Sequence, residues 1–160
     1  MPFVRTARQL AAMALGAVAL AGCSDTTSSL LPPVVPLEQQ VWAPSLGINL
    51  ASMTKLPSGV YIQDLTVGTG ATAAANSTIT VFYTLWIANG TQVQTNVGAT
   101  PFTRALSELI EGWKAGIPGM KVGGKRRLVI PSELGYGVSA QPGIPANSNL
   151  VFDVTLSSIL

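Results

Sequence analysis

The residues with the clearest chemical promise are aromatic and apolar, and they gather in the C-terminal half of the chain. Trp113 and Phe152 are joined there by Tyr136, which stands between Gly135 and Gly137. Nearby glycines and prolines indicate tight turns between the elements that carry these rings. Such a set can line an apolar cup, but it offers almost no acid, base or nucleophile. Any chemistry at this cup must come from a shaped, dry surface.

Side chains that many enzymes need for catalysis are missing from the sequence. The chain has no histidine and a single cysteine, Cys23. Ser-His-Asp and Cys-His catalysis and the usual zinc sites are therefore excluded. No disulfide can form within the chain. We expect neither a metal nor a cofactor.

The first 22 residues have the pattern of a targeting signal. Arg5 and Arg8 precede an uninterrupted apolar run over residues 10–21, which suits a signal-peptide core and is too short to span a bilayer as a helix. The run ends in Leu20-Ala21-Gly22-Cys23, which resembles the lipobox of bacterial lipoproteins. The resemblance implies cleavage before Cys23 and a lipid anchor on its thiol. The alternative is a free cysteine after an ordinary signal.

Cleavage at this point would remove the net charge of the protein. The chain has nine Lys and Arg and seven Asp and Glu. Two of the basic residues and none of the acidic ones lie in the signal, so seven of each remain. Nucleic-acid binding needs clustered basic residues, and the one basic run is Lys125-Arg126-Arg127. We expect this run to be the solvated start of a strand, and we expect no nucleic-acid partner.

The remaining chain divides into a tether, an extension and a domain. Residues 24–36 are rich in Ser, Thr and Pro, which favours an extended, unpaired backbone and predicts a tether. In residues 37–55, scattered apolar side chains could pack on the domain; they are Val41, Trp42, Leu46, Ile48, Leu50 and Met53. We assign 23–57 to the lipidated cysteine, tether and extension, and 58–160 to the domain.

Period-two alternation of apolar residues predicts strands in the domain. Residues 78–88 have the clearest pattern, with one face formed by Ile79, Val81, Tyr83, Leu85 and Ile87. Asn89-Gly90 then predicts a hairpin that returns over 91–95. Further strands are expected from Val60 up to Gly68, over 125–130 and over 149–160, where Leu150, Phe152, Val154 and Leu156 share a face.

One short helix is predicted between these strands. Leu106, Ile110, Trp113 and Ile117 recur at spacings of four, three and four residues, which is one helical face. The helix would start near Ser107 and end at Pro118-Gly119. The expected fold is α+β: an antiparallel sheet with one buried face, which this helix covers.

From about Gly59 to Leu160, the order of these motifs resembles an FKBP-type peptidyl-prolyl cis-trans isomerase. The resemblance implies a twisted antiparallel half-barrel wrapped around the helix. The motifs that carry it are Ser58-Gly59-Val60-Tyr61, Val67-Gly68-Thr69-Gly70, Ile110 with Gly112-Trp113, Gly135-Tyr136-Gly137, Pro142-Gly143-Ile144-Pro145 and Leu150-Val151-Phe152-Asp153-Val154.

The resemblance also implies a site. Trp113 would be the floor beneath the substrate proline, and the Ile110 N–H and the Tyr136 hydroxyl would hold substrate carbonyls. The implied catalytic residues are Tyr83, Trp113, Tyr136 and Phe152, and the implied substrate-binding residues are Val93, Gln94, Leu109, Ile110 and Ile144. Without the resemblance, most of these aromatic residues would be interpreted as ordinary core.

Several positions depart from the family pattern. Val93-Gln94 stands where the family usually has Phe-Asp, with the Asp bonded to the pocket tyrosine. The segment 96–104 is shortened, which puts Phe102 on a core position and leaves Thr100 in place of a wall aromatic. Gln141 replaces a histidine of some members, and one residue is lacking before Pro145. We therefore expect a weaker isomerase, with weakened binding of macrolide-type inhibitors.

The leading functional hypothesis is a monomeric, lipid-anchored isomerase that acts on exported proline-containing chains. Ser24 follows the anchor cysteine, which by resemblance to Gram-negative lipoproteins predicts the outer membrane, facing the periplasm. One alternative is a non-catalytic peptide-binding chaperone or assembly lipoprotein with a degenerate pocket. Another is a structural envelope lipoprotein.

Overall fold

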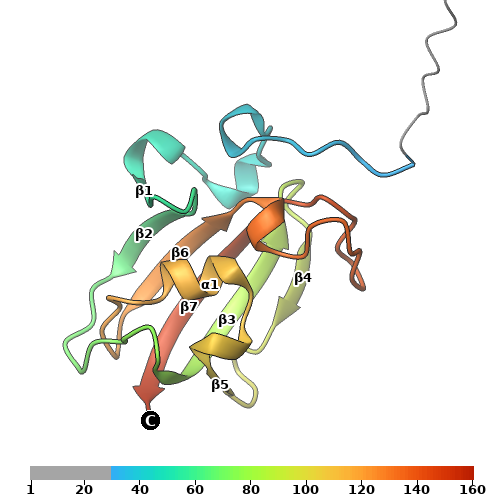
Figure 1. Cartoon of the computed structure of the whole chain (residues 1–160). Helices are drawn as coiled ribbons and strands as arrows, with labels where there is room; N and C mark the ends of the chain where they lie inside the picture. The colour runs from blue at the N-terminus through green and yellow to red at the C-terminus, as the bar shows by residue number, and fades with distance from the viewer. Residues whose placement is uncertain (1–29) are drawn as a thin grey trace, which may run out of the picture.

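The computed structural model describes residues 30–160, which form one antiparallel sheet with a short helix against it (Figure 1). The α+β prediction is confirmed. Along the sheet the order is β1-β2-β6-β7-β3-β4, and β5 pairs with the other end of β3. The strands are β1 (Thr54–Lys55), β2 (Tyr61–Thr66), β3 (Thr78–Ile87), β4 (Gln92–Thr95), β5 (Phe102–Ala105), β6 (Lys125–Ile130) and β7 (Leu150–Ile159).

The main core lies on the inner face of the sheet, which helix α1 (Glu111–Gly116) covers. In β3 and β7 every second side chain points into this core, as the period of two predicts. Tyr83 pairs with Val154 and Leu85 with Phe152, so the two apolar faces predicted from sequence meet directly. The expected hairpin also forms, because Gly90 has φ 88° and donates to the Ile87 carbonyl.

The predicted helix is shorter than the spacing of its apolar residues suggested. Residues 106–108 form a separate 3₁₀ turn, and Leu109 and Ile110 are extended, with ψ of 170° and 150°. Helix α1 begins only at Glu111, so the prediction of a start near Ser107 was wrong. Leu106 is nevertheless buried beside Trp113 and Ile117. The periodic apolar residues therefore share one buried face even though the extended residues Leu109 and Ile110 interrupt the helix.

Two glycines allow α1 to lie very close to the sheet. A Cβ added at Gly112 would lie 2.4 Å from Ile130 Cγ2, and one at Gly116 would lie 2.7 Å from Leu128 Cδ2. Real Cβ atoms do not approach other atoms so closely, since interiors are already densely packed. These positions explain why a helix of six residues contains glycines that lower its intrinsic stability.

The outer face of the sheet is also buried in part, which the sequence prediction of a single buried face missed. Leu37 and Leu46 from the N-terminal extension pack on Tyr61, Val129 and Val151 of the sheet. The extension that supplies Leu37 and Leu46 to this second core runs along the upper end of the sheet in Figure 1. Among the apolar residues of the extension that were predicted to pack, Val41 is exposed. The others contact this second core; they are Trp42, Leu46, Ile48, Leu50 and Met53.

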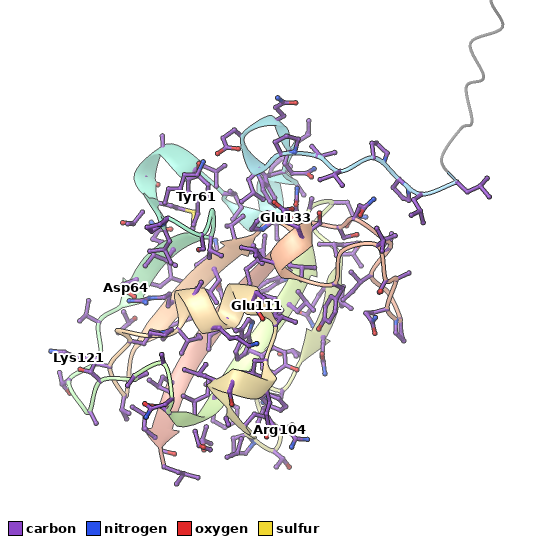
Figure 2. All side chains as sticks on the ribbon, viewed as in Figure 1. Tyr61, Asp64, Arg104, Glu111, Lys121 and Glu133 are labelled. Carbon is purple, nitrogen blue, oxygen red and sulfur yellow. The ribbon has the colours of Figure 1, made fainter. Side chains whose placement is uncertain are left out.

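The basic run starts strand β6 at Lys125, as predicted, but Arg126 and Arg127 are not solvated. Arg126 forms a two-bonded pair with Asp64 and donates to the Gly116 carbonyl at 2.9 Å, so it caps the C-terminus of α1. Arg127 forms the same kind of pair with Asp153 on the outer face. Asp64 lies on β2 at the side of the fold (Figure 2). The strand alternation sends the two guanidinium groups to opposite faces, where each is paired.

The first described residues lie against the domain. We call residues 30–40 the strap, and residues 131–149, which join β6 to β7, the pocket loop. The carbonyls of Pro32 and Val35 in the strap accept hydrogen bonds from the side chains of Asn147 and Asn149 in the pocket loop. The predicted signal, Cys23 and residues 24–29 of the predicted tether lie outside the described residues.

Candidate functional site

An aromatic cluster forms on the inner face where α1 crosses the sheet. Trp113 from α1 meets Tyr83 of β3 edge to face, with ring centroids 5.5 Å apart. Its other neighbour is Phe152 of β7, at 5.3 Å and 87°. Edge-to-face pairs are the favoured arrangement of aromatic rings. Three distant segments of the chain therefore hold one another's rings in fixed orientations.

A hollow of about 80 Å³ opens above this cluster. No charged side chain is among its lining residues, so the hollow is apolar apart from hydroxyl and amide groups. Trp113 is only 4% exposed and yet borders the hollow, which makes it a floor rather than a sealed core residue. The lining residues are Tyr83, Gln94, Phe102, Leu109, Ile110, Trp113, Tyr136 and Phe152.

Two of the predicted site residues, Val93 and Ile144, lie beside this hollow instead. They line a neighbouring hollow of about 420 Å³, together with Gln141 and Pro142. Gln94 and Tyr136 border both hollows. The structure thus brings seven of the nine predicted site residues to the first hollow and places the other two at its extension.

Phe102 is the lining residue that sequence reasoning left out of the site. It was assigned to the core, with Thr100 in the position of a wall aromatic. Phe102 does pack against the core, but it also meets Tyr83 edge to face at 5.9 Å and borders the hollow, while Thr100 is exposed. The two positions are not exclusive here, because the hollow opens directly on the aromatic cluster of the core.

Polar groups at the rim of the hollow act as hydrogen-bond donors. Burial raises the pKa of Tyr83, the neighbouring Tyr136 raises it further, and the side chain of Gln94 acts in the opposite direction. Burial also raises the pKa of Tyr136. Both hydroxyls therefore keep their protons well above neutral pH. Among the described residues, the N–H of Ile110 has no backbone or side-chain acceptor, so it is a third available donor.

The indole N–H of Trp113 is the one buried side-chain polar atom in residues 30–160 without a hydrogen-bond partner. Leaving such a group unpaired costs about 1–3 kcal/mol when no substitute exists. Here the faces and edges of Tyr83 and Phe152 surround the indole, and aromatic faces are weak acceptors. A purely structural residue at this position would need no polar atom, so the buried indole N–H distinguishes Trp113 from ordinary core residues.

Comparison with known proteins agrees with this geometry. The family model for "FKBP-type peptidyl-prolyl cis-trans isomerase" matches residues 70–157. The chain belongs to this family. The match includes the residues that line the hollow, and the sheet wrapped around one short helix is the half-barrel expected of the family.

Solved FKBP-type structures superpose on the chain. A peptidyl-prolyl cis-trans isomerase from Pseudomonas syringae has a TM-score of 0.62 and 30% identity, covering 67% of this chain and 80% of its own. FkpA from Escherichia coli has a TM-score of 0.64 and 33% identity, covering 72% and 55%. AtFKBP13 has a TM-score of 0.62 and 31% identity, covering 68% and 99%.

Curated relatives with high identity are fungal. FK506-binding protein 4 of Chaetomium thermophilum is 44% identical over 72% of this chain and 23% of its own length. FK506-binding protein 4 of Aspergillus fumigatus is 47% identical over 63% and 21%. The chain spans about a quarter of the length of the curated relatives it matches.

Within residues 30–160 there is no cluster of His, Cys, Asp and Glu that could hold a metal ion. The same residues contain no helix long and apolar enough to cross a membrane.

Proposed function

We propose that the protein is a peptidyl-prolyl cis-trans isomerase that assists the folding of exported proline-containing proteins at the cell envelope. The observation that carries the proposal is the uncharged hollow with Trp113 as its floor. Family membership supports the same reaction. Substrates would be polypeptides with accessible X-Pro bonds.

The chemistry follows from the electronic structure of the amide. Resonance gives the C–N bond double-bond character, which produces a rotation barrier of about 18–20 kcal/mol. Resonance also separates charge, and water stabilises that separation. In an apolar hollow the planar amide loses this support, while the twisted amide, with less separated charge, loses less. The barrier falls because the twisted state is bound better than the planar one.

Each part of the site has a distinct task in this reaction. The indole of Trp113 supports the proline ring, and Tyr83, Phe102 and Phe152 exclude water around it. The Ile110 N–H and the Tyr136 hydroxyl donate to substrate carbonyls on either side of the bond. Donors held in place stabilise the bound chain without transferring a proton. No covalent intermediate is formed.

The test is isomer exchange of a short X-Pro peptide, followed by NMR with and without the protein. The wild-type chain is expected to accelerate exchange, and Trp113→Leu to lower kcat/KM at least about tenfold, which corresponds to about 1.4 kcal/mol. Trp86→Leu is the matched control, because Trp86 lies on the outer face, in contact with the second core. Equal losses in both variants would contradict the assignment of Trp113.

A second candidate is a peptide-binding chaperone that does not turn over its ligand. The observation that favours it is Gln94, which borders both hollows in place of the family's aspartate. In the same experiment, peptide chemical-shift changes without faster exchange would support binding alone. Weak binding of a macrolide-type inhibitor is expected in either case, because the aromatic floor is kept while Val93-Gln94 alters the wall.

We further propose that the mature protein is a lipid-anchored monomer, attached through Cys23 to the periplasmic face of an outer membrane. The support is the sequence of residues 1–24, with its apolar run and Leu20-Ala21-Gly22-Cys23. Expression in a Gram-negative host with a clickable fatty acid is the test. The wild type should incorporate label and Cys23→Ala should not. Label in both variants, or in neither, would contradict the anchor.

A further inference from the structure

The pocket loop contains the single non-glycine residue with positive φ in the described chain, Asn147 at 58°. Asparagine tolerates this left-handed conformation better than most residues. Its backbone N–H donates to the Gly137 carbonyl at 2.7 Å, directly after Tyr136. Its side-chain amide donates to the Pro32 carbonyl, also at 2.7 Å. One residue therefore joins the strap to the turn that carries a site hydroxyl.

Asn149 makes a second connection of the same kind and is almost completely buried, at 2% exposure. Its side-chain oxygen accepts from the N–H of Ser132 at 3.0 Å. Its amide nitrogen donates to the Val35 carbonyl at 2.8 Å and to the Gln40 side-chain oxygen at 3.0 Å. A buried amide is costly to leave unpaired, and this one is paired once within the pocket loop and twice with the strap.

These contacts continue to the hollow. Ser132, which Asn149 holds, accepts through its carbonyl from the N–H of Gly137 at 2.8 Å. Gly137 follows Tyr136 in the chain, and its carbonyl accepts from the N–H of Asn147. The strap, Asn147, Asn149, Ser132 and Gly137 thus form one continuous hydrogen-bonded network that ends at the pocket tyrosine.

We propose that Asn147 and Asn149 are positioning residues, through which the strap sets the geometry of Tyr136 and thereby the affinity for the substrate chain. The inference rests on the isomerase function proposed above. It makes the segment N-terminal to the family domain part of the working site. The family match begins only at residue 70, so the dependence belongs to this chain's own extension.

The test uses two mild variants of the full chain. Asn147→Gly keeps the left-handed backbone and its N–H but removes the bond to Pro32. Gln40→Met keeps the side-chain length but removes one acceptor of Asn149, from a position outside the pocket loop. The control is Tyr61→Phe, which removes a hydrogen bond of 2.7 Å between the sheet and Glu38 of the strap but alters no contact of the pocket loop.

Two readouts separate positioning from stability. In Asn147→Gly and Gln40→Met, the Gly137 and Ser139 amides should exchange with solvent at least about tenfold faster than in Tyr61→Phe. For a proline peptide, KM should rise about fivefold while kcat changes little, since uniform binding is lost. The proposal would be overturned if both variants had the same amide exchange rates and the same KM as the wild type. If the wild type fails to accelerate isomerisation, the proposed function fails, and amide exchange alone still decides the strap's role.

Discussion

The two faces of the sheet differ in how they treat charged side chains, although the same strands form both. On the inner face around Trp113, the side chains are aromatic and aliphatic, and the lining of the hollow carries no charge. On the outer face, Arg127 and Asp153 form an ion pair under the extension, with Leu46 supplying a carbonyl acceptor. This fold therefore buries charged side chains where they are paired. It keeps them out of the hollow in which we propose that the substrate amide loses its solvent.

The largest effect is expected from breaking the outer-face ion pair. Arg127→Met leaves Asp153, which is 8% exposed, with only Lys125 at 3.5 Å. Removing one partner of a buried pair is strongly destabilising, here by about 3 kcal/mol. Urea unfolding measures this loss, and kcat/KM below the melting range should stay unchanged. A parallel fall in kcat/KM would mean that the two faces are not independent.

The next effect concerns the inner face alone. Tyr136→Phe removes the hydroxyl that we propose donates to the substrate, and it leaves the ring in place. We expect kcat/KM to fall about tenfold, or about 1.4 kcal/mol, with unfolding free energy changed by less than about 1 kcal/mol. The peptide exchange assay and urea unfolding give the two values. An unchanged rate would remove Tyr136 from the site.

A charge can also be added to the uncharged face. Gln94→Asp places a carboxylate beside Tyr83, whose hydroxyl keeps its proton because burial raises its pKa. Hydrogen bonds to a carboxylate are stronger than those to an amide, so the tyrosine should be held more firmly and kcat/KM should rise about threefold. Gln141→Glu is the control, because Gln141 lines only the neighbouring hollow. If Gln94→Asp is slower than the wild type, the cost of placing a charge in the apolar hollow outweighs the gain from the stronger hydrogen bond.

The smallest effect is a pH dependence on the outer side. Hydrogen bonds from Lys55 and then Tyr61 lower the pKa of Glu38 from 4.5 to about 2. A lowered pKa in the folded state stabilises it above pH 4.5, and the contribution is lost as the pH falls toward 2. Urea midpoints at pH 6 and pH 3 should therefore differ more for the wild type than for Glu38→Gln. Equal differences would contradict the pairing.

Sequence predicted the inner face better than the outer face, for a physical reason. Side chains such as Val81 and Leu156 repeat with the period of a strand, so their burial follows from local pattern. The pairing of Arg126 with Asp64 joins residues far apart in sequence, and no period reveals it. A basic run looks solvated until the partners are known.

The site was predictable to the extent that it follows from resemblance and strand alternation. Tyr83, Trp113 and Phe152 were assigned to one cup and line one hollow. Phe102 was assigned to the core alone, because the sequence does not show that the hollow opens beside its ring. The roles of Asn147 and Asn149 lay outside sequence reasoning, since their partners Pro32 and Val35 belong to a segment interpreted as a tether.

The glycines of α1 set the position of the floor of the hollow, because they determine how closely the helix packs on the sheet. Because no methyl group stands between Gly112 and Ile130, the helix backbone packs directly on the Ile130 side chain, and this contact fixes how far the helix stands from the sheet. An added Cβ at Gly112 would force the helix or Ile130 to shift, and a shift of the helix would move the indole that forms the floor of the hollow. The fit of the substrate is thus adjusted from a position that the substrate never touches.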